Sequence, residues 1–361
     1  MINYFRLFYR YLQVEVLAIP GRVIALSFFI IIGMLPLFTE SPQLLRILIL
    51  ACIYTIYAVS WDLLSGHTGQ ISLGHGLFFG IAGYTAALLN LNFDLGPWIT
   101  IPLGGICSVL IGLLACIPVL RLRGFYLALV TLAYPIILTG IIYMFPDFTG
   151  GELGLFGISR LSKSRVTDAY LVYFIMLFSV LVMYKITDAT SKFVRTGLVF
   201  QSIREDEISA RKSGINTIKY KFMAFSLSAF FAGIAGGLYA HFINIIGPST
   251  LELTFSFQAV LWAIFGGMGT IYGAVAGVFI LMPMMEFLRF IPYGDDIRGI
   301  IFALILIVTL LFMPEGIGVW ARDKIELTCP RCKEINGAWR KRCRICNAHL
   351  QLKDDFSKVV K

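Results

Sequence analysis

The sequence predicts an all-α polytopic membrane protein with a small soluble tail, because long apolar stretches fill most of the chain. Of its 361 residues, 58% are hydrophobic and only 14% are charged, whereas about a quarter of the residues in a soluble globular chain are charged. The apolar runs are continuous and roughly 20 residues long, which suits bilayer-crossing helices and not the alternating strands of a membrane β-barrel. This composition excludes a soluble enzyme.

Ten apolar stretches are the expected transmembrane elements. In chain order they cover residues 23–38, 43–64, 72–91, 98–120, 125–145, 170–186, 221–243, 257–267, 271–289 and 298–314. The eighth is too short to cross a bilayer alone. The glycine-rich sequence FGGMGT at 265–270 favours a break, so we expect two elements within 257–289. A single crossing of this stretch is the alternative.

Basic residues set the expected orientation, because Lys and Arg in short loops lie mainly on the cytoplasmic side. An N-terminal arm, the pair Arg121 and Arg123, and the loop at about 187–220 are then all cytoplasmic. Ten elements return the chain to the same side, so both termini are expected in the cytoplasm. The expected division is an arm at 1–22, a transmembrane domain at 23–314 and a tail at 315–361.

A polar, glycine-rich segment interrupts the apolar pattern between the second and third stretches. The sequence SGHTGQISLGHG (65–76) contains four glycines, two histidines and a glutamine. Non-helical backbone at membrane depth is tolerated only where protein or a water-filled cavity surrounds it. We therefore interpret the segment as a broken helix along a translocation pathway, with an ordinary cytoplasmic turn as the alternative. The candidate pathway residues are Asp62, Gln70, Ser72 and His75.

The long basic loop contains a stretch typical of an amphipathic helix. At 3.6 residues per helical turn, the apolar residues of VFQSIREDEISARKSG (199–214) gather on one side of a helix and the charged residues on the other. Gly214 is expected to end this helix. The apolar residues are Val199, Phe200, Ile203 and Ala210. Such a helix between two transmembrane elements suits docking on a soluble partner. A solvated connector is the alternative.

Five segments carry a family resemblance and occur in the family's order. They are SWDLLSGHTGQISLGHGLFFGIAGYTAALL (60–89), RLRGFYLALVTLA (121–133), TGGELGLFGI (149–158), IREDEISARKSGINTIKYKFMAFSLSAFFAGIAGGLYA (203–240) and VLWAIFGGMGTIYGAVAG (260–277). Together they closely resemble the M-type permease of branched-chain amino acid ABC importers. The resemblance covers residues 20–320 in outline.

The resemblance implies one half of an importer pore in the cytoplasmic (inner) membrane of a prokaryote. The implied partners are a homologous H-type permease, two ATP-binding subunits and an extracytoplasmic amino-acid-binding protein. The amphipathic helix then resembles the coupling helix that contacts the ATP-binding subunit. Its implied contact residues are Arg204, Glu205, Asp206, Glu207, Ala210 and Gly214. ATP is expected only on the partner, since the chain has no GxxxxGK[S/T] phosphate-binding loop.

Two other functions stay open at this point. An ion-coupled secondary carrier or channel for small amphipathic solutes would use ionisable residues within the membrane. Asp62, His75 and Glu286 are the candidates for that role. A membrane anchor whose tail recruits a partner is the third interpretation. Within the importer interpretation, the sequence does not separate leucine, isoleucine or valine from other amino acids, amides or urea.

The tail contains two CxxC pairs, Cys329–Cys332 and Cys343–Cys346. Four such thiolates suit one tetrahedral ion at about 2.3 Å, and a unit with so small a core needs a metal to fold. We therefore expect a structural zinc site in a zinc-ribbon-like tail, with two disulfides or a rubredoxin-like iron site as alternatives. A reducing cytoplasm disfavours disulfides. The tail departs from the family pattern; its basic residues suit anionic membrane lipid or an acidic partner surface, and specific nucleic-acid binding is not expected.

Overall fold

Two compact units make up the protein. The computed structural model describes residues 20–38, 41–119, 122, 124–162, 164–188, 195–288, 294–332, 335–343 and 345–350. The larger unit comprises residues 39–317, and the smaller unit combines residues 1–38 with 318–361. Residues 1–19 of the expected N-terminal arm, and the basic pair Arg121 and Arg123, lie outside the described residues.

Apolar helices build almost all of the larger unit, which confirms the expected all-α polytopic membrane fold. In the described part of the chain, seven helices are long and apolar enough to cross a bilayer. They are α3 (Pro42–Thr68), α4 (Gly76–Phe93), α5 (Pro97–Val119), α6 (Phe125–Met144), α8 (Arg165–Thr187), α11 (Thr217–Ile243) and α13 (Ile271–Leu288). Shorter apolar segments lie in α12 (Leu253–Gly266), α14 (Gly294–Phe312) and, in the smaller unit, α2 (Pro20–Phe38). Each of the ten expected stretches thus corresponds to one helix.

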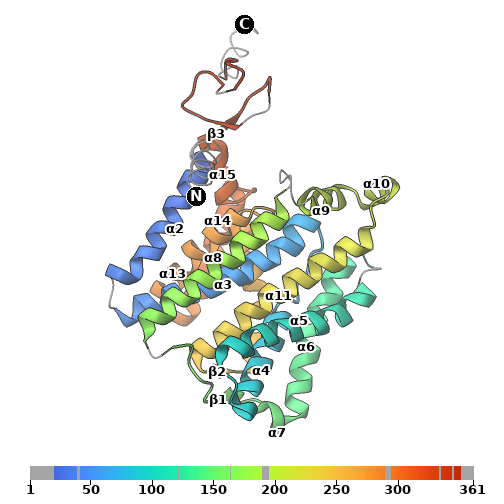
Figure 1. The fold of residues 1–361 in the computed structure, drawn as a ribbon, viewed down its shortest axis with the longest axis vertical. Coiled ribbons are helices and arrows are strands. Elements are labelled where there is room, and N and C mark those ends of the chain that lie inside the picture. Colours follow the sequence, from blue (N-terminus) through green and yellow to red (C-terminus); the bar gives the residue numbers. More distant parts are fainter. Residues whose placement is uncertain are drawn as a thin grey trace, which may run out of the picture. The chain divides into compact units, whose positions relative to one another are not determined.

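Helices α3 and α11 lie at the centre of the larger unit. α11 packs against α3, α4 and α5, and α3 also packs against α8 (Figure 1). A Cβ atom on Gly233 would lie 2.8 Å from the Cα atom of Gly105, and one on Gly236 would collide with the Phe79 carbonyl oxygen. In lipid, helix association depends on such close backbone contact. These glycines therefore set the spacing between α4, α5 and α11.

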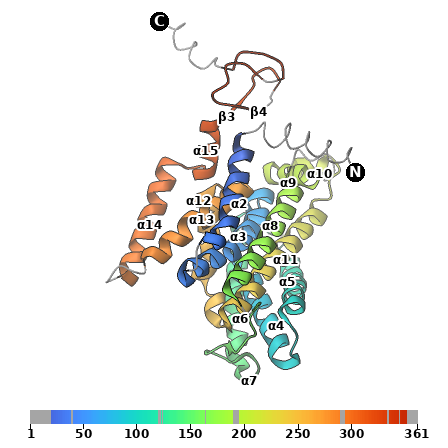
Figure 2. The ribbon, with the colours of Figure 1, turned by 60° about the vertical axis from the view of Figure 1, so that its left-hand side comes forward.

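Two helix breaks lie against the C-terminal end of α3. The first, at residues 69–75, follows α3, which ends at a left-handed Gly69 (φ 70°). The second separates α12 from α13 and contains Gly267 (φ 121°) and Gly269 (φ 78°), which are conformations that favour glycine. Both α12 and α13 pack on α3 (Figure 2). The expected break within 257–289 is confirmed.

Short connecting elements lie at the opposite end of the larger unit. These include α7 (Pro146–Thr149), η2 (Pro248–Leu251) and the antiparallel strands β1 (Leu155–Phe156) and β2 (Ile245–Ile246). They lie at the other end of the unit from α9 (Thr196–Glu205) and α10 (Glu207–Lys212), as Figure 1 shows. The Asn244 side-chain amide donates to the Ile158 carbonyl oxygen at 2.8 Å. The loop that carries β1 is therefore fastened to the end of α11.

The smaller unit contains a compact tail after α15 (Ile317–Ile325). Strand β3 (Glu326–Thr328) pairs with the antiparallel strand β4 (Ile335–Gly337). A further bridge joins Arg342 to His349. Cys329, Cys343 and Leu350 are buried together. Cysteine side chains thus form most of the core of this tail.

Candidate functional site

Hydrogen bonds pack the break at 69–75 into the larger unit. The Trp61 Nε1–H group donates to the Ser72 carbonyl oxygen at 2.6 Å. From α6, the hydroxyl oxygen of Thr131 accepts the backbone N–H of Leu73 at 3.0 Å. Protein groups thus satisfy backbone atoms that a broken helix leaves without helical partners, which is the condition for irregular backbone at membrane depth.

His75 lies at the end of this break and is fully buried. Its Nε2 atom is 2.9 Å from the Ser60 hydroxyl oxygen, and its ring centroid is 5.2 Å from that of Tyr57. The Ser228 hydroxyl of α11 donates to the Ser60 carbonyl oxygen at 2.8 Å. The second ring nitrogen of His75, Nδ1, has no hydrogen-bond partner among the described residues. A buried polar atom without a partner is costly, so Nδ1 is a candidate contact for a solute.

The four predicted pathway residues are all buried in this region. Asp62, Gln70, Ser72 and His75 are each less than a tenth exposed. The Asp62 carboxyl oxygen Oδ1 accepts the backbone N–H of Gly269 at 2.6 Å, which joins α3 to the second break. The structure therefore brings these residues together at the end of α3, and their part in transport stays a prediction.

The amphipathic loop forms two short helices, so the expectation of one continuous helix is wrong. α9 ends at Glu205 and α10 begins at Glu207, because Asp206 between them has an extended backbone. Its carboxylate accepts the Ile208 N–H at 2.8 Å and thereby caps α10. The Ser209 hydroxyl donates to the same carboxylate at 2.6 Å, and these hydrogen bonds hold the pKa of Asp206 below its usual value.

The inner side of the α9–α10 element packs against other helices of the larger unit. Phe200, Ile203 and Ala210 are buried, as the amphipathic pattern predicts. Lys221 at the start of α11 is only 2% exposed, and its Nζ atom lies 2.8 Å from the Glu207 Oε2 atom. This ion pair joins α10 to α11 at a site almost without solvent.

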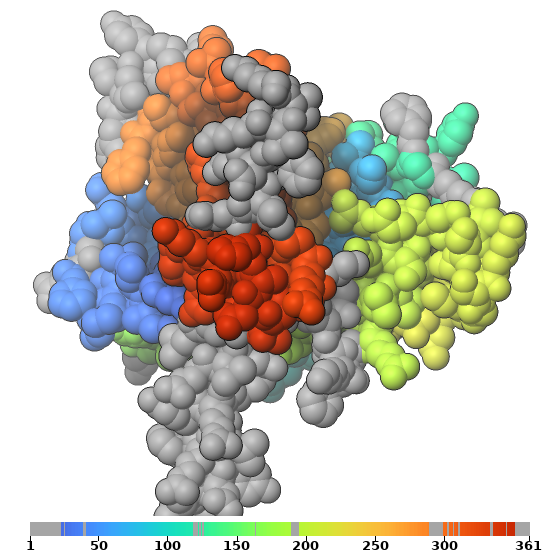
Figure 3. Space-filling view, turned by 90° about the horizontal axis from the view of Figure 1, so that it is seen from above, coloured from blue at the N-terminus to red at the C-terminus, as the bar shows by residue number. Residues whose placement is uncertain are grey.

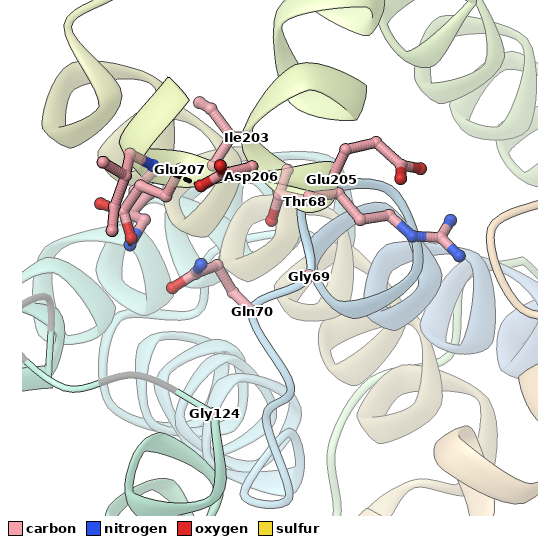
Figure 4. A pocket seen from close by; sticks show the side chains of 11 residues that line it. Thr68, Gly69, Gln70, Gly124, Ile203, Glu205, Asp206 and Glu207 are labelled. Atoms are coloured by element: carbon pink, nitrogen blue, oxygen red, sulfur yellow. Dashed lines mark hydrogen bonds and ion pairs between the residues drawn. The ribbon is translucent and has the colours of Figure 1, made fainter. Parts of the chain in front are cut away.

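The outer side of the α9–α10 element is exposed, and Figure 3 shows both helices on one face of the larger unit. A hollow of about 270 Å³ lies where the turn between α9 and α10 meets the start of the 69–75 break. Gln70 lines it together with Asp206 and Glu207, and in Figure 4 the Gln70 side chain lies beneath these two acids. The hollow therefore connects the loop surface to a predicted pathway residue.

The six predicted contact residues divide into two groups. Glu205, Asp206 and Gly214 are exposed. The other three make contacts within the chain: Arg204, although exposed as well, donates to the Gly66 carbonyl oxygen at 2.6 Å, Glu207 binds Lys221, and Ala210 is buried. Contact of any of the six with a soluble partner stays a prediction.

Sequence reasoning did not single out Lys221, which is the first residue of the expected apolar stretch 221–243. One signal was available, because Lys221 lies inside an apolar helix, where a buried ammonium group needs an ionic partner. Nothing in the sequence names Glu207 as that partner, since the two residues belong to different helices.

The tail brings its four cysteines together as a candidate metal centre. Their sulfur atoms all lie within 4.8 Å of one another, and both Cys329–Cys346 and Cys332–Cys343 have sulfurs 3.5 Å apart. Ligands about 2.3 Å from a tetrahedral ion lie about 3.8 Å from each other, so the spacing fits one ion. A disulfide bond is about 2.05 Å long, and none of these four cysteines forms a disulfide.

Backbone hydrogen bonds prepare two of these cysteines for metal binding. The N–H of Cys346 lowers the pKa of Cys343 to about 6, and the N–H of Cys332 lowers the pKa of Cys329. A lower pKa favours the thiolate, which is the form that binds metal. The donor set and its charge state therefore fit a metal ion.

Comparison with known proteins covers most of the chain. Residues 43–310 match the family described as "branched-chain amino acid transport system / permease component". The high-affinity branched-chain amino acid transport system permease protein LivM of Escherichia coli K12 is 29% identical over 326 residues, covering 83% of this chain and 74% of the relative. LivH of the same organism is 25% identical, covering 73% and 90%. BraD of Pseudomonas aeruginosa is 24% identical, covering 76% and 94%. The chain belongs to the branched-chain amino acid transport permease family.

Proposed function

We propose that this protein is a transmembrane permease subunit of an ABC importer and forms part of the pathway for branched-chain or related amino acids. Family membership and the names of its relatives support this proposal. The main structural support for the proposal is the α9–α10 element, because its outer side is exposed and its inner side is joined to the membrane helices. A coupling element needs both properties, since it must receive force from a soluble partner and pass it on.

The proposed complex contains a homologous H-type permease, two ATP-binding subunits and an extracytoplasmic amino-acid-binding protein. ATP hydrolysis belongs to the ATP-binding partner, since this chain has no GxxxxGK[S/T] loop. The proposed coupling residues are Arg204, Glu205, Asp206 and Gly214, which are exposed, together with the half-buried Glu207 and the buried Ala210. Arg204 in addition reaches inward to the Gly66 carbonyl oxygen.

The proposed pathway runs along the 69–75 break. Two buried polar atoms there, His75 Nδ1 and Gln70 Oε1, have no hydrogen-bond partner among the described residues. They are available to the charged ends of an amino acid, and the aliphatic side chain passes the apolar groups of the surrounding helices. The Ser72 carbonyl oxygen, which accepts the Trp61 Nε1–H, holds this break in place, and Asp62 binds the backbone of the second break at Gly269.

The proposed location is the cytoplasmic membrane of a prokaryote, with both termini in the cytoplasm. The proposed division is an arm at 1–22, a transmembrane domain at 23–314 and a tail at 315–361. In the tail, Cys329, Cys332, Cys343 and Cys346 hold a structural zinc ion, and the basic surface contacts membrane lipid rather than nucleic acid. Zinc supplies the tail with the cross-link that its small core lacks.

Purification of the full chain in mild detergent, followed by mass spectrometry of the proteins that accompany it, tests this proposal. We expect two ATP-binding subunits and a second permease. Glu205→Lys should reduce recovery of the ATP-binding subunits, whereas Glu252→Lys, at an exposed acid of the opposite end, should not. Recovery of the chain alone, with uptake driven by an ion gradient and indifferent to ATP, would establish a carrier instead.

A further inference from the structure

Arg204 lies where the α9–α10 element meets both helix breaks. Its Nη1 atom donates to the carbonyl oxygen of Gly66 at 2.6 Å, 138 residues away in the chain. A Cβ atom on Gly69 would lie 3.4 Å from the Arg204 Cα atom, and one on Gly269 would lie 2.5 Å from its Nη1 atom. The last turn of α9 is therefore in direct contact with the beginning of the first break and with the second break.

Asp62 completes this contact from the α3 side. Its carboxyl group is fully buried, and its Oδ1 atom accepts the N–H of Gly269 at 2.6 Å across 207 residues of chain. A Cβ atom on Gly66 would collide with that carboxyl oxygen and would lie 2.6 Å from the Gly269 nitrogen. Gly269 is thus held between the guanidinium group of Arg204 and the carboxyl group of Asp62.

The absence of side chains at Gly66, Gly69 and Gly269 lets three backbone segments meet at one point. Packed, hydrogen-bonded groups move together, because a small displacement of one breaks contacts with the others. A displacement of α9 must therefore displace the ends of both breaks or break the Arg204 hydrogen bond. A loosely docked surface helix could move without displacing the breaks and without breaking a hydrogen bond to them.

We infer that Arg204 and Asp62 form a latch that passes movement of the α9–α10 element to the helix breaks at 69–75 and 267–270. Both are positioning residues, since neither is assigned a contact with the solute or with ATP in this role. The inference rests on the proposed function, because it takes an ATP-binding partner as the source of the movement. It gives Arg204 an internal task that differs from that of its exposed neighbours Glu205 and Asp206.

The test compares Arg204→Met and Asp62→Ala with Lys219→Met, a variant of an exposed lysine in the first turn of α11. The intact complex in proteoliposomes is assayed for ATP hydrolysis and for uptake of radiolabelled leucine. We expect both latch variants to assemble, with a fall in leucine uptake at least tenfold larger than any fall in ATP hydrolysis. The ratio of ATP hydrolysed to leucine transported then rises about tenfold. The double variant should be no worse than either single variant, because both cut the same connection.

A proportional loss of hydrolysis and uptake, or full uptake in Arg204→Met, would overturn the latch. Hydrogen exchange on the purified chain gives a second readout that needs no partner. Arg204→Met should raise exchange at 69–75 and at 267–270, while Lys219→Met should not, and unchanged exchange in Arg204→Met would also overturn the inference. Failure of the wild-type complex to couple uptake to ATP would refute the proposed function and leave the exchange result to decide the latch.

Discussion

Replacing Glu207 by Gln should destabilise the larger unit more than any nearby surface substitution. Lys221 is 2% exposed and Glu207 is 13% exposed, with 2.8 Å between Nζ and Oε2. Glu207 Oε1 also accepts hydrogen bonds from Arg211 at 3.1 Å and from Thr217 at 3.3 Å. The substitution keeps the size of the side chain but leaves the Lys221 ammonium group without its carboxylate.

Breaking a buried ion pair by removing one partner costs about 3–5 kcal/mol. We expect about 3 kcal/mol here, because the residual exposure of Glu207 lets some solvent reach the site. Replacing both partners removes the uncompensated charge and is often close to neutral. The double variant Glu207→Gln with Lys221→Met should therefore recover most of the lost stability.

Equilibrium unfolding of the full chain in mixed micelles measures these differences. Glu205→Gln is the matched control, since the neighbouring acid is exposed and exposed substitutions usually stay within about 0.5 kcal/mol. A Glu207→Gln variant as stable as this control would refute the argument. An additive loss in the double variant would refute it equally, because it would show that the two charges do not depend on each other.

Two further results follow from the packing and from the tail. Gly236→Ala should destabilise the larger unit by about 1–3 kcal/mol through overpacking, since the new methyl group meets the Phe79 carbonyl oxygen. Gly140→Ala is the control, because Gly140 has open space around it. Equal melting temperatures for the two variants would contradict the packing account. Cys329→Ser should abolish the one zinc ion per chain that elemental analysis is expected to find, and should raise hydrogen exchange across the tail while leaving the larger unit unchanged. A zinc-free wild-type chain would contradict the metal site.

The helical framework was accessible from the sequence because each membrane helix is an apolar run with little competing signal. The break before Ile271 was accessible for a similar reason, since the glycines at 266, 267 and 269 are local. The cysteine cluster was predictable from spacing, because the segment between two CxxC pairs lets the pairs converge on one ion.

Features that depend on tertiary contact were not accessible. The division of the amphipathic segment at Asp206 follows from an N-cap that competes with helix continuation, and periodicity does not reveal which of the two prevails. The partners of Asp62 and Lys221 lie on other elements. Arg204 has an exposed position on an amphipathic helix, and only the fold shows that its guanidinium group reaches Gly66.

The central claim is that the exposed acids of the α9–α10 element couple this chain to an ATP-binding partner. The most direct measurement is ATP hydrolysis by the reconstituted complex, with and without solute-loaded binding protein, in the wild type and in Glu205→Lys and Asp206→Lys. The account predicts that loaded binding protein stimulates hydrolysis in the wild type and in the Lys219→Met control, at an exposed lysine. Glu205→Lys and Asp206→Lys should both lose this stimulation together with uptake. Intact stimulation and uptake in Glu205→Lys and Asp206→Lys would contradict the claim.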